Sequence, residues 1–138
     1  MNVAYDQARF LWATAGLDWR VTDLVLVAWS GAPNFVKTDV KVADIVARGL
    51  TALAGYSQVI TQKSVAVDGA MQTNNVVIPA VPIGPPVTHF TMCRRNATPN
   101  QSELLLFVDD AEGLPFTTNG LDMVVTPDWT LNRGWAYA

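Results

Sequence analysis

A histidine and a cysteine four residues apart carry the most reactive chemistry in this sequence. His89 is the single histidine among the 138 residues, and Cys93 is the single cysteine. Residues four apart on a strand point to the same side, so an imidazole base and a thiol would share one face. A hydrolytic relay also needs a carboxylate that orients the histidine, and no spacing in the sequence indicates one. The structural interpretation, a strand histidine and a buried cysteine, is therefore favoured.

An acidic cluster is the candidate cation site. Asp109, Asp110 and Glu112 precede Gly113, but the alternating ligands and distant glutamate of a calcium loop are absent, which favours a solvated turn. One cysteine and one histidine also exclude a cysteine-rich or two-histidine zinc site. The sequence has no phosphate-binding loop, dinucleotide-binding glycine pattern or nucleophilic-serine turn. We expect no catalytic residue, no cofactor and no metal, and hence a protein that is not an enzyme.

The chain contains unusually few charged residues. They make up 15% of the sequence and hydrophobic residues 50%, whereas about 25% charged is usual. The net charge of −3 argues against a nucleic-acid partner, which selects basic surfaces. The N-terminus lacks the order of a signal peptide, and no apolar run approaches the ~20 residues of a membrane span. We expect a cytoplasmically made homo-oligomer, with no membrane partner, that buries part of its surface against other subunits.

The apolar pattern predicts short strands and few helices. A helix is expected over Ala4–Ala15, where apolar residues recur every three or four positions, and a shorter one near Val42–Arg48. Thr22–Trp29 is expected to be a central, buried strand because β-forming residues dominate it. The other expected strands are Tyr56–Thr61, Lys63–Val67, Met71–Pro79, Thr88–Arg95, Glu103–Asp109, Leu121–Thr126 and Gly134–Ala138.

Turn signals separate these strands. Asp68-Gly69 and Asn119-Gly120 are expected to form hairpin turns, since both residues of each pair tolerate a positive φ. The prolines between Pro79 and Pro86 cannot lie inside a central strand and are expected to link two β segments. The spacing predicts one β-rich domain over residues 1–138, an antiparallel β-sandwich or jelly-roll-like fold with a short N-terminal helix.

Charge is divided unevenly along the chain. Residues 31–95 carry six basic and three acidic residues, a net of +3, whereas residues 96–138 carry one basic and six acidic residues, a net of −5. If the basic and acidic segments form separate surfaces in the fold, this division favours self-association or docking on a charged lattice. They favour neither if the two signs mix in the fold.

The chain opens with the expected N-terminal helix, the turn Leu17-Asp18-Trp19 and a strand that begins at Asp23. Its closing half contains Leu105, Leu106, Val108 and Asp109, the turn Gly113–Gly120, and then Asp122, Met123, Val125 and Trp129. This order of segments resembles that of small virion proteins of tailed bacteriophages. The resemblance spans nearly the whole chain and departs from the pattern at Ile83–Pro86.

This resemblance implies a capsid cement or decoration protein, on the outer capsid surface of the virion. Its partners would be the major capsid protein and one or two further copies of this chain, as a dimer or trimer. Such a protein needs a rigid β scaffold and apolar edges that become buried on assembly, and many weak copies gain avidity. The apolar side chains expected either at this interface or in the core are Trp29, Phe35, Phe116 and Trp129.

Three alternative functions stay open at this point. The chain could be a tail, neck or head-fibre component of the virion, although a fibre favours a longer, repetitive sequence. It could be a carbohydrate-binding domain that uses exposed tryptophans, of which Trp129 is the clearest loop candidate. It could also be a small hydrolase that uses His89 with Cys93.

Overall fold

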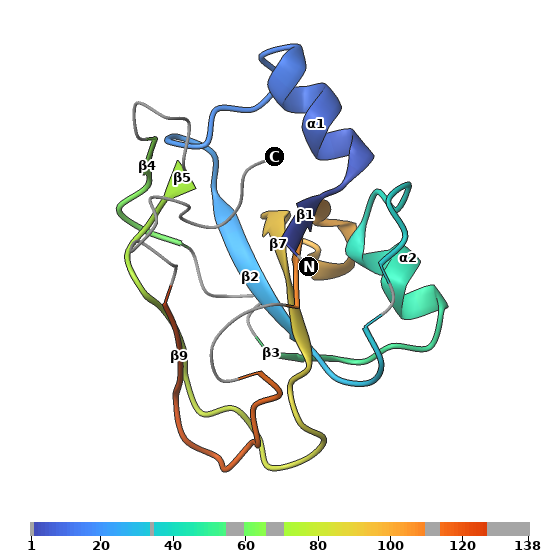
Figure 1. Cartoon of the computed structure of the whole chain (residues 1–138), viewed down its shortest axis with the longest axis vertical. Helices are drawn as coiled ribbons and strands as arrows, with labels where there is room; N and C mark the ends of the chain where they lie inside the picture. The colour runs from blue at the N-terminus through green and yellow to red at the C-terminus, as the bar shows by residue number, and fades with distance from the viewer. Residues whose placement is uncertain (1, 34, 55–59, 66–70, 110–113, 127–138) are drawn as a thin grey trace.

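The structure, a computed structural model, describes residues 2–33, 35–54, 60–65, 71–109 and 114–126 (Figure 1). The elements alternate short strands with a few helical turns. In chain order they are β1 (Asn2–Ala4), α1 (Asp6–Ala13), β2 (Leu24–Trp29), α2 (Val42–Ala47), β3 (Ala52–Ala54), β4 (Ser64–Val65), β5 (Met71–Gln72), β6 (Val76–Ile78), β7 (His89–Arg94), η1 (Pro99–Gln101), β8 (Glu103–Val108) and β9 (Met123–Val125).

A five-stranded sheet organises the described residues. Its order is β1-β8-β7-β2-β3 and every neighbouring pair is antiparallel. β2 lies between β7 and β3, with Val27 opposite Thr91, and all six of its residues are buried. A strand reads as a continuous apolar run when both faces of its sheet are covered, which explains the sequence of Leu24–Trp29.

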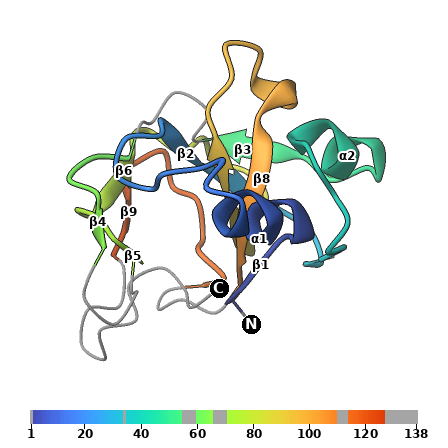
Figure 2. The same ribbon diagram turned by 90° about the horizontal axis from the view of Figure 1, so that it is seen from above.

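Alternate residues of the sheet enter two different cores. On β2, Leu24, Leu26 and Ala28 face one cluster, while the residues between them face the other. The first cluster lies under α1, β6 and β9, and the second lies under α2. Figures 1 and 2 show α2 on one side of β2 and the β6–β9 pair on the other. The sheet is therefore the middle layer between two chemically different coverings.

Side-chain capping defines where α2 begins. The Oδ2 atom of Asp44 accepts hydrogen bonds from the backbone N–H groups of Lys41 and Val40, over 3.0 and 2.9 Å. These bonds satisfy donors that a helix leaves free at its first turn, and they lower the pKa of Asp44. Val42 and Ile45 then face the second core. A helix of six residues would be unstable in isolation, and here packing and capping stabilise it.

Two segments far apart in sequence, residues 76–87 and 116–125, run antiparallel side by side, and we call this pair the ribbon. At one end β6 pairs with β9, with Val77 opposite Val124. At the other end Val87 and Phe116 exchange backbone hydrogen bonds of 2.9 and 2.8 Å. The prolines of 76–87 have no N–H to donate, so only short stretches form a regular ladder. One side of the ribbon packs on the first core.

A G1 β-bulge lies in the middle of the ribbon. Gly120, with a φ of 80°, and Leu121 together face Val81. The Gly120 N–H donates to the Val81 carbonyl over 3.0 Å, and the Val81 N–H donates to the Leu121 carbonyl over 3.1 Å. Two residues opposite one, the first a left-handed glycine, define this bulge. The prediction of a hairpin at Asn119-Gly120 is therefore wrong, because β9 pairs with β6.

The sequence predictions agree with most of the described elements. The β-rich class with antiparallel sheets is confirmed, as are the N-terminal helix, the short helix at Val42 and the buried strand β2. The expected strand Met71–Pro79 is split into β5 and β6, with Thr73–Asn75 between them. Most of Tyr56–Thr61, the Asp68-Gly69 turn and the strand Gly134–Ala138 lie outside the described residues.

Candidate interaction surface

The histidine is a neutral core residue. His89 is 1% exposed, its ring stacks at 11° on Trp29 with the centroids 6.4 Å apart, and it also contacts Phe107. The Thr88 hydroxyl donates to the Gly31 carbonyl over 2.6 Å, so it accepts the second bond from His89 Nδ1–H over 2.9 Å. Burial lowers the pKa of His89 to about 4, and Asp109 offsets this in part. The imidazole is therefore uncharged at neutral pH.

The thiol is also protonated and buried. Cys93 has no exposed surface, and its Sγ lies 3.5 Å from the Thr91 hydroxyl. Burial raises the pKa of Cys93 to about 12, whereas a nucleophilic cysteine needs a lowered pKa. His89 pairs with Trp29 and Cys93 with Val25, so the two lie four residues apart along one strand, about 13 Å. The structure does not bring them together as a catalytic pair.

The acidic cluster lies mostly beyond what the structure shows. Asp110, Glu112 and Gly113 are outside the described residues, and Asp109 is half-buried just after β8. Among the residues that are described, no group of three or more histidine, cysteine, aspartate or glutamate side chains is placed to hold a metal ion. In the same part of the chain, no helix is long and apolar enough to cross a membrane.

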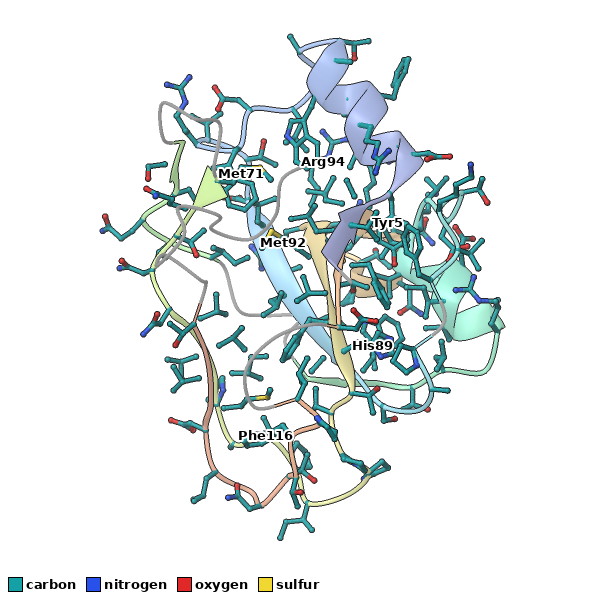
Figure 3. All side chains as sticks on the ribbon, in the orientation of Figure 1. Tyr5, Met71, His89, Met92, Arg94 and Phe116 are labelled. Carbon is teal, nitrogen blue, oxygen red and sulfur yellow. The ribbon has the colours of Figure 1, made fainter. Side chains whose placement is uncertain are left out.

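The aromatic residues expected at an interface or in the core have different positions. Trp29 has no exposed surface, and its indole N–H donates to the Thr91 hydroxyl over 2.9 Å, so it belongs to the core. Phe35 is half-buried beside Tyr5 and Phe107, with centroids 5.0 and 5.3 Å away. Phe116 is half-buried in the ribbon, well apart from Tyr5 in Figure 3. Trp129 lies outside the described residues.

Four of the eight large apolar side chains that are exposed in the described residues belong to the ribbon. Val77 is 43% exposed and Val124, directly opposite it, is 57% exposed. Leu121 at the bulge is 65% exposed and Ile83 is 80% exposed. Gly120, next to Leu121 in the chain, lies near Ile83, because a Cβ atom added at Gly120 would be 3.8 Å from the Ile83 Cγ1 atom. We call these four residues the ribbon face.

The ribbon face stands on a nearly uncharged part of the chain. Asp122 is the only charged residue in segments 76–87 and 116–125. Its Oδ1 atom accepts a hydrogen bond from the Ala80 N–H over 2.9 Å. The aromatic residues expected at an interface do not mark this surface, whose signal in the sequence is the lack of charge. The signal was present, since residues 69–93 contain no aspartate, glutamate, lysine or arginine.

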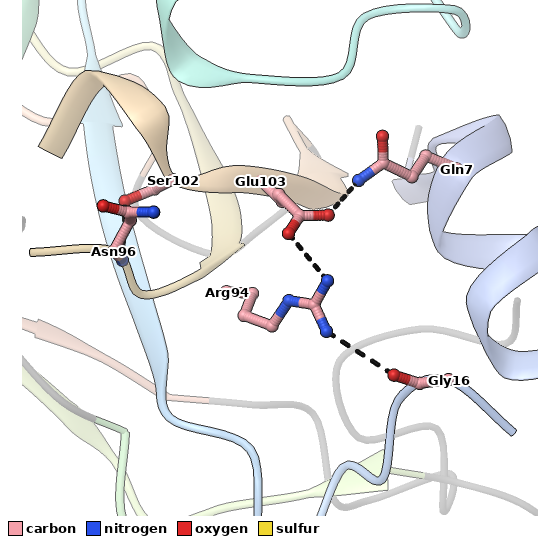
Figure 4. Close-up of polar contacts among 6 residues, drawn as sticks. All are labelled: Gln7, Gly16, Arg94, Asn96, Ser102 and Glu103. Carbon is pink, nitrogen blue, oxygen red and sulfur yellow. Dashed lines mark hydrogen bonds and ion pairs between the residues drawn. The ribbon is translucent and has the colours of Figure 1, made fainter. Parts of the chain in front are cut away.

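Charged side chains form a network elsewhere, where β7 ends and β8 begins beside α1. Arg94 Nη2 lies 2.7 Å from Glu103 Oε1, and Arg94 also reaches the Gly16 carbonyl over 3.5 Å (Figure 4). Gln7 of α1 donates to the other Glu103 oxygen. This network holds α1 against β7 and β8. It also joins a basic residue of one half of the sequence to an acidic residue of the other, so the two signs mix here.

A second ion pair anchors α2. Arg48 Nη1 lies 2.8 Å from Asp39 Oδ1 and 2.7 Å from Oδ2. Only the contact with Oδ1 has hydrogen-bond geometry, so Oδ2 is held by charge alone. The Asp39 side chain is 9% exposed, which keeps this attraction from being screened as a surface pair would be.

Comparisons of the chain with protein-family models, with curated proteins and with solved structures found no match. The arguments about function therefore rest on the residues and geometry described above.

Proposed function

We propose that this chain is a non-enzymatic structural protein of a tailed-bacteriophage virion. In this proposal it is a capsid cement or decoration protein that binds the major capsid protein lattice on the outside of the head. The observation that carries the proposal is the ribbon face, four exposed aliphatic side chains on a part of the fold with a single charged residue, Asp122. Exposed contiguous apolar groups are typical of surfaces that other proteins cover.

The chemistry of the core supports an assembly role over catalysis. The histidine and the cysteine are buried, uncharged and apart, and each already has a hydrogen-bond partner, Thr88 for His89 and Thr91 for Cys93. An enzyme places such groups where substrate reaches them, with pKa values near the working pH. A cement protein needs only a rigid scaffold and surfaces to bury, and repetition of weak contacts over a lattice supplies the affinity.

The layered fold fits the same role. The ribbon packs across one face of the five-stranded sheet, and we propose that this pairing of strand layers is a β-sandwich or a jelly-roll-like variant of one. In such an architecture the inner side of each layer forms the core, and the outer side is available to partners. The segment order that resembles small virion proteins runs through both layers.

A binding experiment on capsids tests the proposal. Purified chain is mixed with heads assembled from the major capsid protein without a decoration layer, and the heads are pelleted. We expect saturable co-sedimentation at a fixed number of copies per head, and an electron cryomicroscopy map with added density on the outer surface. A chain that stays in the supernatant, or immunogold label on virion tails alone, would overturn the assignment to the head.

A further inference from the structure

Asn119 and Gly120 form the one asparagine–glycine pair in the sequence, and both residues are exposed. We propose that Asn119 is a modification site at which spontaneous deamidation occurs, and that the pairing of the ribbon controls the rate of this reaction. The proposal goes beyond the proposed function and does not rest on it, because it concerns the chemistry of the chain alone.

The reaction needs water as its only co-reactant. The backbone nitrogen of Gly120 attacks the Asn119 Cγ atom and a bond forms between them, while the Cγ–Nδ2 bond breaks. Nδ2 leaves as ammonia, which takes the proton that the Gly120 nitrogen gives up. Water then opens the cyclic imide at either carbonyl and yields aspartate or isoaspartate. No group is oxidised or reduced, and the product carries one additional negative charge.

The bulge holds the side chain of Asn119 in a position that favours attack. Its Oδ1 atom accepts a hydrogen bond from the Leu121 N–H over 3.0 Å, which folds the side-chain amide back over the peptide bond to Gly120. Negative charge develops on this oxygen when the Cγ atom is attacked, and a hydrogen-bond donor already placed there stabilises that charge. Gly120 also has no Cβ atom to hinder the approach of its nitrogen.

Asn96 provides an internal comparison. Its Oδ1 atom accepts a hydrogen bond from the Thr98 N–H over 2.9 Å, the same pattern as at Asn119, and Asn96 is also exposed. The residue that follows it is Ala97, whose Cβ atom hinders attack by the backbone nitrogen. Asn96 should therefore stay intact while Asn119 reacts.

The paired ribbon restrains the nucleophile. The Gly120 N–H donates to the Val81 carbonyl over 3.0 Å, and the nitrogen must leave this bond before it can lose its proton and approach Asn119. The Thr118 hydroxyl secures the same part of the ribbon, because it accepts a hydrogen bond from the Gly84 N–H over 2.8 Å and donates one to the Gly84 carbonyl over 3.0 Å. Local opening of the ribbon should therefore limit the rate of deamidation.

Incubation of the folded protein at mildly alkaline pH, followed by peptide mass spectrometry, tests the inference. We expect the mass change of amide hydrolysis at Asn119, with isoaspartate among the products, and none at Asn96. Thr118→Val removes both hydroxyl bonds and should raise the rate about 10-fold, the factor expected for the loss of two neutral hydrogen bonds. Thr14→Val is the matched control, because that hydroxyl donates to a backbone carbonyl of α1 over 2.9 Å, outside the ribbon. It should react at the wild-type rate.

The chain unfolded in urea gives the reference rate, which should exceed that of the folded protein. The inference is overturned if Asn119 stays intact in the folded protein, if it reacts as fast there as in urea, if Asn96 reacts equally, or if Thr118→Val and Thr14→Val react at the same rate. Circular dichroism must show that Thr118→Val is folded. Asp122→Ala, which removes the hydrogen bond from the Ala80 N–H, is the second variant of the ribbon and should also react faster than wild type.

Discussion

The two coverings of the central sheet exclude water equally well and yet differ in chemistry. On one side, the layer that contains α2 carries charged side chains that form ion pairs, such as Arg48 with Asp39. On the other side, Val77 and Val124 of the ribbon are exposed, and its one charged residue, Asp122, is exposed and accepts a hydrogen bond from the Ala80 N–H. The α2 side shows that the outer surface of a covering layer can carry polar side chains. Folding therefore does not require the exposed apolar side chains of the ribbon. It is available for recognition.

Titratable groups divide in the same way. Among the described buried residues, Tyr5, Asp39, His89 and Cys93 lie in or beside the second core, under α2. The first core, between the sheet and the ribbon, consists of aliphatic, aromatic and methionine side chains. The α2 side should therefore carry the pH response of stability, and the ribbon side should carry association.

Truncation of a buried leucine on each side gives the largest effect and tests whether the two cores are equally packed. Leu26→Ala opens a cavity in the first core and Leu104→Ala one in the second, and both side chains have no exposed surface. We expect each to lower the free energy of unfolding by about 2–5 kcal/mol. Urea denaturation measures this. A loss confined to one variant would mean that one covering contributes little to stability.

The pH dependence of stability should come from His89. Its pKa is about 6.5 in an unfolded chain and about 4 in the folded protein, so between these values the unfolded state binds more protons. Stability is complete above pH 6.5 and falls as the pH drops towards 4, by about 3 kcal/mol at most. Urea denaturation of wild type and His89→Phe over this range measures the difference. Parallel pH curves for the two proteins would refute the assignment.

Removal of the buried ion pair should destabilise the α2 side alone. Asp39→Asn keeps the shape of the side chain but removes the charge that faces Arg48. We expect a loss of about 1.5–3 kcal/mol, the range of hydrogen bonds to charged groups. Asp18→Asn is the control, because the Asp18–Arg20 pair is well exposed and contributes little. A loss in Asp18→Asn as large as the loss in Asp39→Asn would contradict this assignment.

The bulge gives a smaller, local effect on the ribbon side. Gly120 has a φ of 80°, a conformation that costs an L-residue about 1–2 kcal/mol. We expect Gly120→Ala to lower the free energy of unfolding by that amount, and Gly84→Ala, where a Cβ meets open space, to have less effect. Thermal unfolding compares the two. Equal losses would argue against the bulge.

The smallest effect on stability should come from the ribbon face itself. Val124→Lys places a charge at a position that is 57% exposed, so we expect a change within about 0.5 kcal/mol. Val125→Lys, one residue later and 6% exposed, should be strongly destabilising because it faces the first core. Urea denaturation of both variants makes the comparison. Equal losses would place Val124 in the core.

The sequence predicts elements better where local and tertiary preferences agree. Leu24–Trp29 is a strand by composition and is buried on both faces, and Val42–Ala47 is a helix by pattern and capping. The ribbon was predicted poorly because prolines interrupt one of its strands. Asn119-Gly120 correctly predicts the positive φ found at Gly120, but a positive φ does not determine which segment pairs with the next strand.

The candidate surface was harder to predict than the fold. A tryptophan such as Trp29 suits an interface or a core equally, and only the position of Thr91 as its acceptor shows that it is buried. Val76 and Val77 have the same side chain, but Val76 is buried in the first core and Val77 is exposed to solvent. Such differences depend on tertiary packing. The stretch without charged residues, 69–93, is the one local property of the sequence that pointed to the ribbon.

The prolines of segment 76–87 have a consequence for growth of assemblies. A chain that displays aliphatic side chains risks stacking strand on strand without limit, because each added edge exposes another. Four missing N–H groups and a bulge weaken such a template on the ribbon. A strand added along segment 76–87 would leave several of its own carbonyl groups without donors, so growth through this edge is disfavoured.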